Sequence, residues 1–389
     1  MSLVKLSEFG KIVMGMSPSG ETYNEKGEGL PLLNGPTEFT STSPIPKLYT
    51  TDSKRECEFG DLIFCVRGST TGKMNWADQV FSIGRGVCAI RGENSIDTKY
   101  IRYCIEQNLK GLLAVAGGGT FPNLKKDDIG NFEIPIVQNR LRIVKILSAY
   151  DDLIENNLKR IKLLEETAQN IYKEWFVNFR FPNYEHTAFD AESGLPVGWE
   201  KKSLNNFDCV YQFKEKVKPY IGEKEYLATA NIEGINISER GEYFTFENRP
   251  SRAQHLAPQE SVWFARMSKT YKVILFTKSS NSDILLSSGF VGFIPKKSQF
   301  LPFLFCLINN KLFFDTKDMF CTGSTQVSLN NESINKLIFV EPNEKILTEF
   351  GNKVYPLIEQ INKLFELNQK LKEARDILLP RLMNRTIEV

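Results

Sequence analysis

Two stretches of the chain carry apolar residues at alternating spacings of three and four positions, the pattern of a helix that buries one narrow stripe. The first stripe consists of Ile143, Leu147, Tyr150, Ile154, Asn157, Ile161, Leu164, Ala168, Ile171 and Trp175. The second consists of Leu347, Phe350, Val354, Leu357, Ile361, Leu364, Asn368, Leu371, Arg375, Leu378 and Leu382. The pattern predicts two long helices that form a coiled coil.

Each stripe contains an asparagine, and an asparagine in a coiled-coil seam is best satisfied by another polar group. We therefore expect the helices to pair in opposite directions with Asn157 facing Asn368. In that register the apolar positions also meet: Ile143 faces Leu382, Leu147 faces Leu378, Ile161 faces Leu364 and Trp175 faces Phe350. The alternative is two separate amphipathic helices, each packed against its own globular domain.

Two prolines fall within the second stripe. Because proline lacks an N–H group, Pro356 predicts that this helix kinks or restarts near Tyr355, and Pro380 limits its end in the same way. Further apolar residues lie outside the stripes, where they can contact partner subunits or the globular domains: Leu153, Leu158, Leu163, Ile358 and Phe365.

The chain repeats itself at an offset of about 205 residues, which is the signature of a duplicated architecture. Residues 119–129 match residues 324–334, with Thr120, Leu124 and Ile129 aligned on Thr325, Leu329 and Ile334. A weaker echo relates residues 61–64 to residues 261–264. We therefore expect two similar domains with divergent surfaces.

Short β-like runs separated by Gly, Pro and Asn precede each long helix. We expect strands at residues 62–66, 87–90, 271–277 and 290–294, and helices at residues 98–113 and 301–314. Two turn-rich stretches, residues 180–184 and 193–199, break the helical periodicity and form a linker. The predicted class is α+β: two tandem globular domains separated by an antiparallel coiled-coil spacer, with a pseudo-twofold internal repeat.

Composition places the chain among ordinary globular proteins, with 389 residues, 41% hydrophobic, 25% charged and a net charge of +2. No apolar run approaches the roughly 18 residues of a membrane-spanning helix, and residues 1–20 lack a signal pattern, so we expect a cytoplasmic protein. The seven cysteines include no C-x-x-C pair and accompany only two histidines. We expect reduced, mostly buried thiols and no metal site.

Motifs for catalysis are weak. Residues 68–74 resemble a P-loop, but there is one residue too few between the glycines, and Met74 stands where Ser or Thr would bind magnesium. Residues 84–89 resemble a dinucleotide fingerprint, yet a strand is expected where that motif needs a helix. The sequence also lacks the Asn-Pro-Pro-aromatic run of amino-methyltransferases. We expect no catalytic residues.

Several motifs follow one another in the order of a known family. Residues 131–136 followed by 142–157, then residues 194–200, 323–334 and 375–383, resemble the specificity (S) subunits of type I restriction-modification systems over the whole chain. The resemblance implies a non-catalytic subunit that binds double-stranded DNA, holds two methyltransferase (M) subunits on its helices and is joined by restriction (R) subunits. It also implies that AdoMet, ATP and Mg belong to those partners, with no cofactor on this chain.

The resemblance also implies a layout of two target-recognition domains and two spacer helices. The first recognition domain is expected at residues 1–137 and the central spacer helix at residues 138–180. Residues 181–198 form the linker, residues 199–341 the second recognition domain, and residues 342–389 the C-terminal spacer helix and tail. A seam from Ile143 to Trp175 spans roughly 50 Å, more than one turn of DNA at about 34 Å, so the spacer is long enough to serve two half-sites.

Reading base edges requires short polar side chains on loops or a helix, whereas Lys and Arg contact phosphates without sequence information. The candidates in the first domain are Arg67, Ser69, Thr70, Lys73 and Thr120, with Lys125 and Lys126 as phosphate contacts. Those in the second are Arg266, Ser268, Lys269, Tyr271, Lys272, Ser324, Thr325 and Gln326. The alternative for each is a solvated loop residue.

The expected function is therefore reading of a bipartite, asymmetric DNA site. Three other functions stay open. They are a non-catalytic coiled-coil adaptor, a self-sufficient nuclease or methyltransferase, and an S-like subunit of a related system with a fused restriction-methylation partner.

Overall fold

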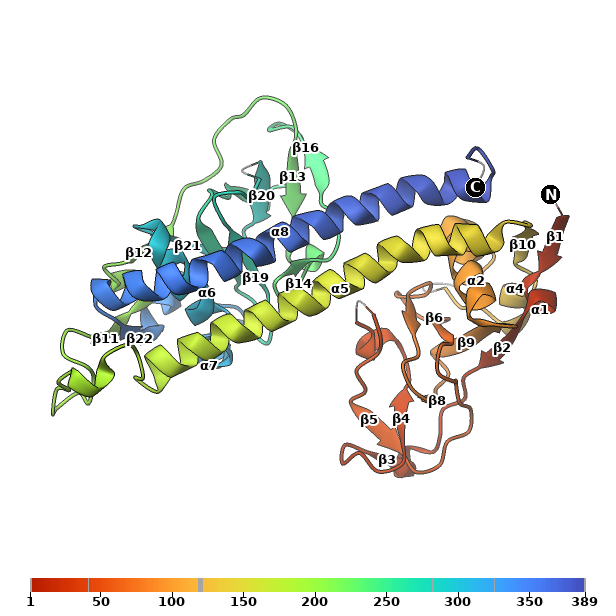
Figure 1. Ribbon diagram of the computed structural model, residues 1–389, viewed down its shortest axis with the longest axis horizontal. Helices are drawn as coiled ribbons and strands as arrows, with labels where there is room; N and C mark the ends of the chain where they lie inside the picture. Colours follow the sequence, from red (N-terminus) through yellow and green to blue (C-terminus); the bar gives the residue numbers. More distant parts are fainter. Residues whose placement is uncertain (1, 41, 118–121, 282, 325, 388–389) are drawn as a thin grey trace. The chain divides into compact units, whose positions relative to one another are not determined.

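The computed structural model describes residues 2–387 except 41, 118–121, 282 and 325, and its fold is mixed α/β (Figure 1). The chain divides into two compact units. Unit 1 comprises Met1–Glu155 and Lys370–Val389, and unit 2 comprises Asn156–Gln369. Each unit therefore contains one globular domain and part of each long helix.

Unit 1 contains a strand pair and two four-stranded sheets. The pair joins β1 (Ser2–Lys5) to β10 (Glu133–Ile136). The first sheet has the order β2 (Gly10–Met14), β9 (Val87–Gly92), β6 (Leu62–Cys65) and β7 (Met74–Trp76). The second has the order β3 (Tyr23–Asn24), β5 (Leu48–Thr50), β4 (Leu30–Leu33) and β8 (Ser82–Ile83). Its helices are α1 (Leu6–Phe9), α2 (Ser95–Gln107), α3 (Leu109–Ala114) and α4 (Lys126–Gly130), with short 3₁₀ turns at Gly20–Thr22 and Pro36–Glu38.

Unit 2 also contains a strand pair that frames its domain, β11 (Glu200–Ser203) with β22 (Ile338–Glu341). Its first four-stranded sheet has the order β12 (Val210–Phe213), β21 (Phe290–Pro295), β18 (Ser261–Ala265) and β19 (Val273–Phe276). The second has the order β16 (Glu242–Phe244), β13 (Lys224–Leu227), β20 (Ile284–Ser287) and β17 (Ala253–Leu256), and β14 (Ile232–Glu233) pairs with β15 (Asn236–Ile237). Its short helices are α6 (Leu301–Ile308) and α7 (Lys311–Met319), with 3₁₀ turns at Tyr184–His186, Leu204–Asn206, Thr229–Asn231, Ser298–Phe300 and Ser333–Lys336.

The central strands of the two units make corresponding contacts. In unit 1, Leu62 lies opposite Ile90 and Trp76 in the neighbouring strands. In unit 2, Val262 lies opposite Phe293 and Leu275. The two strand pairs also end in the same hydrogen bond: Leu6 N donates to Phe132 O, and Leu204 N donates to Leu337 O, both at 2.8 Å. The first sheets and the strand pairs of the two domains thus share one pattern of backbone pairing.

The central strand β6 is buried along its whole length, which explains its continuous run of apolar residues. Because successive side chains point to opposite faces, Leu62 and Phe64 pack with α2, whereas Ile63 packs with Leu33 and Phe81 on the other face. Strand β18 alternates in the same way: Val262 and Phe264 pack with α6, and Trp263 packs with the second sheet.

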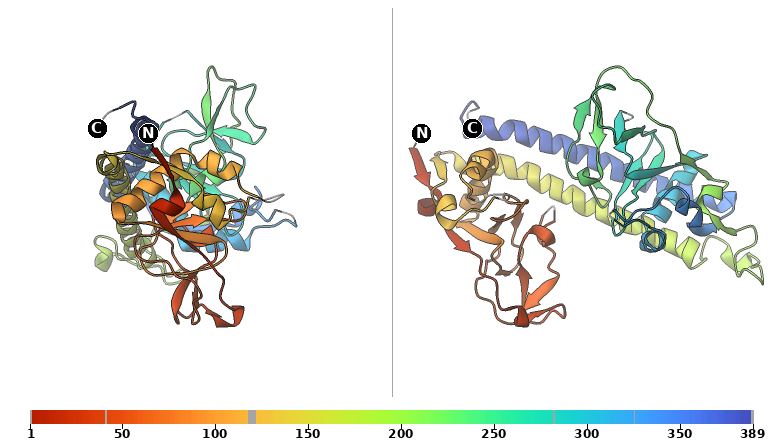
Figure 2. Two further views of the ribbon diagram at one scale, coloured as in Figure 1. Left: turned by 90° about the vertical axis from the view of Figure 1, so that its right-hand side faces the viewer. Right: turned by 180° about the vertical axis from the view of Figure 1, so that it is seen from behind.

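Two long helices, α5 (Arg140–Tyr172) and α8 (Glu344–Met383), run in opposite directions and lie side by side within each unit (Figures 1 and 2). A π-helical turn, Lys173–Val177, extends α5. In unit 2, Asn157 Nδ2 donates to Asn368 Oδ1 at 2.8 Å, and both residues are buried. These are the two asparagines that the sequence analysis set opposite each other.

Further contacts follow the same register. The Trp175 and Phe350 rings lie 5.6 Å apart, and Ile161 shares a cluster with Ile361 and Leu364. In unit 1, Ile143 and Leu147 share a cluster with Leu378 and Leu382. Apolar burial and the amide pair therefore agree on one alignment of the two helices.

The prolines do not interrupt α8 as expected. The helix continues through Pro356 without restarting, and it passes Pro380 to end at Met383. Val354 and Ile358, which flank Pro356, are fully buried, so packing offsets the backbone hydrogen bond that proline cannot donate. Ile358 was also expected on the outer face, and the structure corrects this assignment.

The other expected helices are each broken in two by asparagines. Asn108 separates α2 from α3, and Asn309 and Asn310 separate α6 from α7. Asn310 begins α7 as an N-cap, because its side chain accepts a hydrogen bond from Leu312 N at 2.9 Å. The linker after α5 is non-helical apart from a 3₁₀ turn, yet Phe181 and Leu195 are buried in the core of unit 2.

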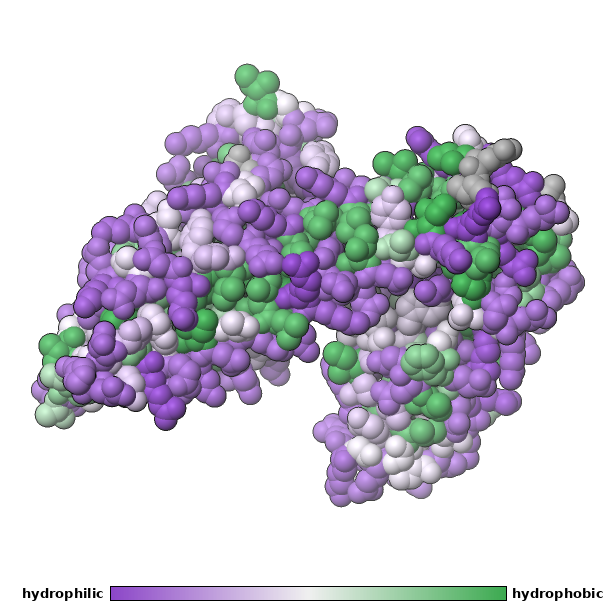
Figure 3. Space-filling model, viewed as in Figure 1, coloured by the Kyte–Doolittle hydropathy of each residue, from purple (hydrophilic) through white to green (hydrophobic). Residues whose placement is uncertain are grey.

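The face shown in Figure 3 is mostly hydrophilic, with scattered apolar patches. Three leucines of α5 are among the exposed apolar residues: Leu141, Leu153 and Leu163. The exposure of Leu153 and Leu163 agrees with their predicted place outside the seam.

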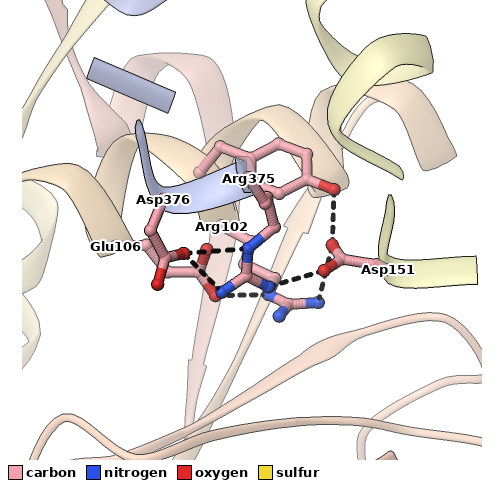
Figure 4. A network of polar contacts seen from close by, with 6 residues as sticks. Arg102, Glu106, Asp151, Arg375 and Asp376 are labelled. Carbon is pink, nitrogen blue, oxygen red and sulfur yellow. Dashed lines mark hydrogen bonds and ion pairs between the residues drawn. The ribbon is translucent and has the colours of Figure 1, made fainter. Parts of the chain in front are cut away.

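A polar network ties the domain of unit 1 to both long helices (Figure 4). Asp151 of α5 accepts hydrogen bonds from Arg375 Nη1 of α8 at 2.6 Å and from Tyr103 OH of α2 at 2.7 Å. Arg102 Nε of α2 donates to Glu106 at 2.8 Å, and its Nη1 lies 3.7 Å from Asp151. Although burial acts in the opposite direction, the carboxylates of Glu106 and Asp151 raise the pKa of Arg375. The network orients α2 on the long helices.

We expect Asp151→Ala to lower the free energy of unfolding of unit 1 by roughly 2–3 kcal/mol, because Arg375 and Tyr103 lose their shared acceptor in a mostly buried site. Urea denaturation followed by circular dichroism measures the effect. Asp152→Ala is the matched control, since Asp152 is the exposed neighbour on the same helix. Equal stability of the two variants would show that the network does not hold α2.

The register of the long helices predicts that Ala168→Cys and Leu357→Cys form a disulfide efficiently, since Ala168 is buried in the core cluster of unit 2 and Leu357 packs against that cluster. Non-reducing electrophoresis with mass spectrometry measures the crosslink. The mismatched control pairs Ala168→Cys with Ile361→Cys, one turn away. Preferential crosslinking of the control pair would contradict the register set by Asn157 and Asn368.

Candidate nucleic-acid interface

In unit 1, the loop between β6 and β7 packs against the segment that leads into α4. Gly68 N donates to Pro122 O at 3.2 Å, and Leu124 N donates to Val66 O at 3.0 Å. Thr71 Oγ1 donates to the same Pro122 carbonyl at 3.2 Å, and Arg67 Nε donates to Asn123 Oδ1 at 3.1 Å. The fold therefore brings two polar segments together that are about 55 residues apart in the sequence.

Unit 2 repeats this arrangement in the loop between β18 and β19. Ser268 N donates to Val327 O at 3.0 Å, and Leu329 N donates to Arg266 O at 2.9 Å. Gln326 Nε2 lies 3.4 Å from the Met267 sulfur. We call the β6–β7 loop (residues 66–73) loop 1 and the β18–β19 loop (residues 266–272) loop 2. Each loop lies beside the segment that carries the sequence repeat.

Most of the predicted unit 1 residues lie on this surface with side chains open to solvent. Arg67, Ser69 and Lys73 are exposed on loop 1, and Thr70 is half-buried beside Cys65. Lys125 and Lys126 are exposed at the start of α4. Thr120 lies outside the described residues. The exposed side chains provide both hydrogen-bond donors and positive charge, which suits contact with DNA bases and phosphates.

The predicted residues of unit 2 fall into two groups. Lys269, Tyr271, Ser324 and Gln326 are exposed, and Ser268 is half-buried on loop 2. Thr325 lies outside the described residues. Lys272 is half-buried and donates to Thr229 O at 2.7 Å, and burial lowers the pKa of its ammonium group. Lys272 therefore anchors the end of loop 2 within unit 2.

Arg266 supports loop 2 from within unit 2. Its guanidinium donates to Leu329 O at 3.3 Å and to Asn331 Oδ1 at 2.8 Å, and burial lowers its pKa. The backbone pairing aligns Arg266 with Val66. Val66 N donates to Gly86 O at 2.9 Å, and Arg266 N donates to Gly289 O at 2.8 Å. Met267 stands where unit 1 has Arg67. The sequence had set Arg67 and Arg266 in matching segments, and the structure shifts them by one position.

Sequence reasoning missed two supporting residues. Asn123 accepts the Arg67 hydrogen bond, and it lies inside the repeated segment, where it aligns with Ser328 of the second copy. Asn331 accepts the Arg266 hydrogen bond three residues farther along. Asn123 belongs to the loop that occurs twice in this chain, but an asparagine that supports an arginine has no sequence signature of its own.

Loop 1 is not a phosphate-binding P-loop. It leads directly into strand β7 at Met74, whereas a P-loop needs a helix N-terminus at that point. Residues 84–86 likewise lead into strand β9, as expected. The seven cysteines are all free, and six are buried. Burial raises the pKa of the Cys57 and Cys104 thiols to about 12, so these groups are poor nucleophiles.

Comparisons with known proteins point to one family. Residues 1–166 match the model of the type I restriction modification DNA specificity domain. The chain is 24% identical over 420 residues to the type I restriction enzyme MjaIX specificity subunit of Methanocaldococcus jannaschii, covering 97% of this chain and 91% of that protein. The first 166 residues thus match a type I restriction-modification DNA specificity domain, and nearly the whole chain is similar to a specificity subunit. The resemblance seen in the sequence is thus confirmed.

Other specificity subunits show the same similarity. The HindI specificity subunit of Haemophilus influenzae is 22% identical over 341 residues, which cover 71% of this chain and 73% of that protein. The crystal structure of the type I restriction-modification S subunit from M. genitalium matches 97% of this chain and 94% of its own, with a TM-score of 0.56 and 16% identity. That likeness establishes a shared mixed α/β fold. Among the described residues, we find no helix with the length and apolarity needed to cross a membrane.

Arg266 is half-buried and Arg67 is exposed, so we expect their substitution to affect stability differently. We expect Arg266→Met to lower the free energy of unfolding by about 2 kcal/mol, because it leaves the Leu329 carbonyl and the Asn331 side chain without their donor. Arg67→Met should change it by less than about 0.5 kcal/mol, because Arg67 is exposed. Urea denaturation of both variants without DNA provides the comparison. Similar losses would contradict the supporting role of Arg266.

Proposed function

We propose that this chain is the DNA-binding specificity subunit of a type I restriction-modification complex and that it reads a bipartite, asymmetric site. The observation that carries the proposal is that each unit, by itself, places a loop with exposed polar side chains beside the segment that carries the sequence repeat. A polar loop on a rigid sheet can enter the major groove, where base edges carry a distinct pattern of donors and acceptors. Two such surfaces with different residues suit two different half-sites.

We assign residues 1–137 and 199–341 to the two target-recognition domains. Residues 138–180 form the central spacer helix, residues 181–198 the linker, and residues 342–389 the C-terminal spacer helix and tail. The antiparallel coiled coil of α5 and α8 is the proposed spacer, and the shared order of β2-β9-β6-β7 and β12-β21-β18-β19 supports an internal repeat. The hydrogen bond between Asn157 and Asn368 supports a defined spacer register.

We propose a division of labour among the exposed residues. Arg67, Ser69 and Thr70 read bases in the first half-site, and Lys73, Lys125 and Lys126 contact phosphates. In the second half-site, Ser268, Tyr271, Ser324 and Gln326 read bases, and Lys269 contacts phosphate. Arg266 and Lys272 contribute indirectly, because their side chains are half-buried and bond to the protein. Phosphate contacts give affinity and base contacts give specificity.

The proposed subunit is non-catalytic and acts through partners. Two methyltransferase subunits and the restriction subunits would supply the chemistry, together with AdoMet, ATP and Mg. The family match to a DNA specificity domain supports this assignment. The loop 1 geometry also supports it, since the nearest approach to a nucleotide motif in the sequence leads into a strand.

A single-molecule methylome tests the proposal. Cells that carry this gene with its neighbouring methyltransferase gene should show an asymmetric bipartite motif that disappears when this gene alone is deleted. The control is a strain in which the methyltransferase is shown to be expressed and active. Unchanged methylation on deletion, or one short contiguous motif, would refute the proposed function and favour an adaptor.

Variants of single reading residues should separate the half-sites. We expect Arg67→Ala to relax the motif only in the first half-site and Gln326→Ala only in the second, each by about 1–3 kcal/mol in base discrimination. The methylome of each variant provides the measurement, and the untouched half-site is its internal control. Relaxation of both half-sites by one variant would contradict the division between the two units.

A further inference from the structure

Helix α7 carries a fully buried lysine beneath loop 2. The side chain of Lys317 is 0% exposed. Its Nζ donates to Met267 O at 2.6 Å and lies 3.5 Å from Ala265 O and 3.0 Å from Asp318 Oδ1. The Phe314 ring lies 5.3 Å from the same nitrogen. The buried ammonium group therefore joins α7 to the end of β18, where loop 2 begins.

Neighbouring residues of α7 bond to the rest of loop 2. Asp318 Oδ2 accepts a hydrogen bond from Lys269 N at 3.0 Å. Lys269 has a φ of +55°, an unfavourable conformation for a side chain of this kind, so the loop needs support at this point. Tyr271 OH donates to Asp315 at 3.2 Å, and its ring lies 4.6 Å from Phe314. One face of α7 thus fixes the shape of loop 2.

Unit 1 supports loop 1 in a different way. Gly117 in unit 1 and Thr322 in unit 2 make corresponding β-bridges, to Asn123 and Ser328. Leu112 of α3 and Lys317 of α7 each stand five positions before these residues, so the two side chains occupy corresponding positions. Leu112 is buried, and a Cβ at Gly72 of loop 1 would lie 3.1 Å from Leu109. Loop 1 therefore rests on an apolar helix, whereas loop 2 is held by charges and hydrogen bonds.

We propose that Lys317 and Asp318 are positioning residues that hold loop 2 in the shape that reads the second half-site. This inference rests on the proposed function. Neither residue needs to touch DNA, because each acts through the backbone of residues 265–269. A leucine fills the corresponding site in unit 1, so the fold does not require a lysine there.

The energetics favour a local role for this lysine. Burying an ammonium group is unfavourable unless hydrogen bonds and a counter-charge compensate, and an apolar residue of similar volume is often as stable. Lys317 has both forms of compensation, from Met267 O and from Asp318. The advantage of the lysine over an apolar residue is that a hydrogen bond has a preferred direction. Its bond to the Met267 carbonyl fixes the orientation of loop 2, which apolar packing would leave less defined.

The first test measures loop 2 without DNA. Hydrogen exchange with mass spectrometry on the full chain should show about tenfold faster exchange in the peptide 266–272 for Lys317→Met than for the wild type, as expected for the loss of one hydrogen bond. Lys311→Met is the matched control, because Lys311 is an exposed lysine on the same helix. Unchanged exchange in Lys317→Met would overturn the inference.

The second test measures discrimination by the chain with its methyltransferase partner. DNA with one wrong base pair in either half of the wild-type motif is compared with the cognate site. Lys317→Met should reduce discrimination in the second half-site about tenfold and leave the first unchanged. Equal discrimination by the wild type and by Lys317→Met would overturn the inference. A wild type without any sequence preference would instead refute the proposed function itself.

A second variant covers the case in which Lys317→Met destabilises unit 2 as a whole. Asp318 is 21% exposed, so Asp318→Ala removes the acceptor for Lys269 N at the surface of the domain. Faster exchange in loop 2 and weaker second-half discrimination in Asp318→Ala would support the inference. Normal loop exchange and normal discrimination in this variant would overturn it.

Discussion

Asn157 and Asn368 face each other in the seam between α5 and α8, where each side chain is about 5% exposed. A buried amide must find a polar partner, and at this depth each asparagine finds the other at 2.8 Å. A shift by one turn would set Asn157 against Leu364 and leave two amides unsatisfied. Apolar contacts alone tolerate such shifts better, since a shifted seam still places apolar residues opposite apolar residues, and a polar seam residue specifies the register. The amide pair therefore selects one alignment, and the domains attach to the helices in that alignment.

The attachment itself differs between the units. In unit 1 a network of arginines and carboxylates joins α2 to the long helices, with Asp151 at its centre. In unit 2 the corresponding contact uses amides, because Gln169 Nε2 donates to Asn309 O at 2.8 Å and Asn309 Nδ2 donates to Glu165 at 2.7 Å. Burial raises the pKa of Glu165, so this carboxyl group is held less firmly in its charged form. Backbone pairing is shared by the first sheets of the two domains, while the side chains that orient the domains have diverged.

Periodicity in the sequence predicted the long helices and their facing positions, because a seam leaves a regular apolar trace over many turns. The central strands at residues 62–66 and 290–294 were also predictable, since buried strands read as continuous apolar runs. Local breaks were not predictable. Asn310 caps α7 through a side-chain hydrogen bond that an asparagine within a helix would not make, and α8 passes Pro356 because its neighbours are buried. Packing decides such positions, and one sequence does not display it.

The candidate site shows the same limit at the level of single residues. Arg67 and Arg266 occupy similar places in the sequence, but Arg266 directly follows β18 and aligns with the buried Val66, whereas Arg67 stands one residue farther from β6. Arg266 bonds to Asn331 and to a backbone carbonyl. Arg67 stays exposed beside Asn123. Residue type alone therefore does not distinguish a side chain that contacts a ligand from one that shapes a loop. The distinction depends on where the hydrogen-bond partners lie, and for both arginines those partners come from a segment more than 50 residues away in the sequence.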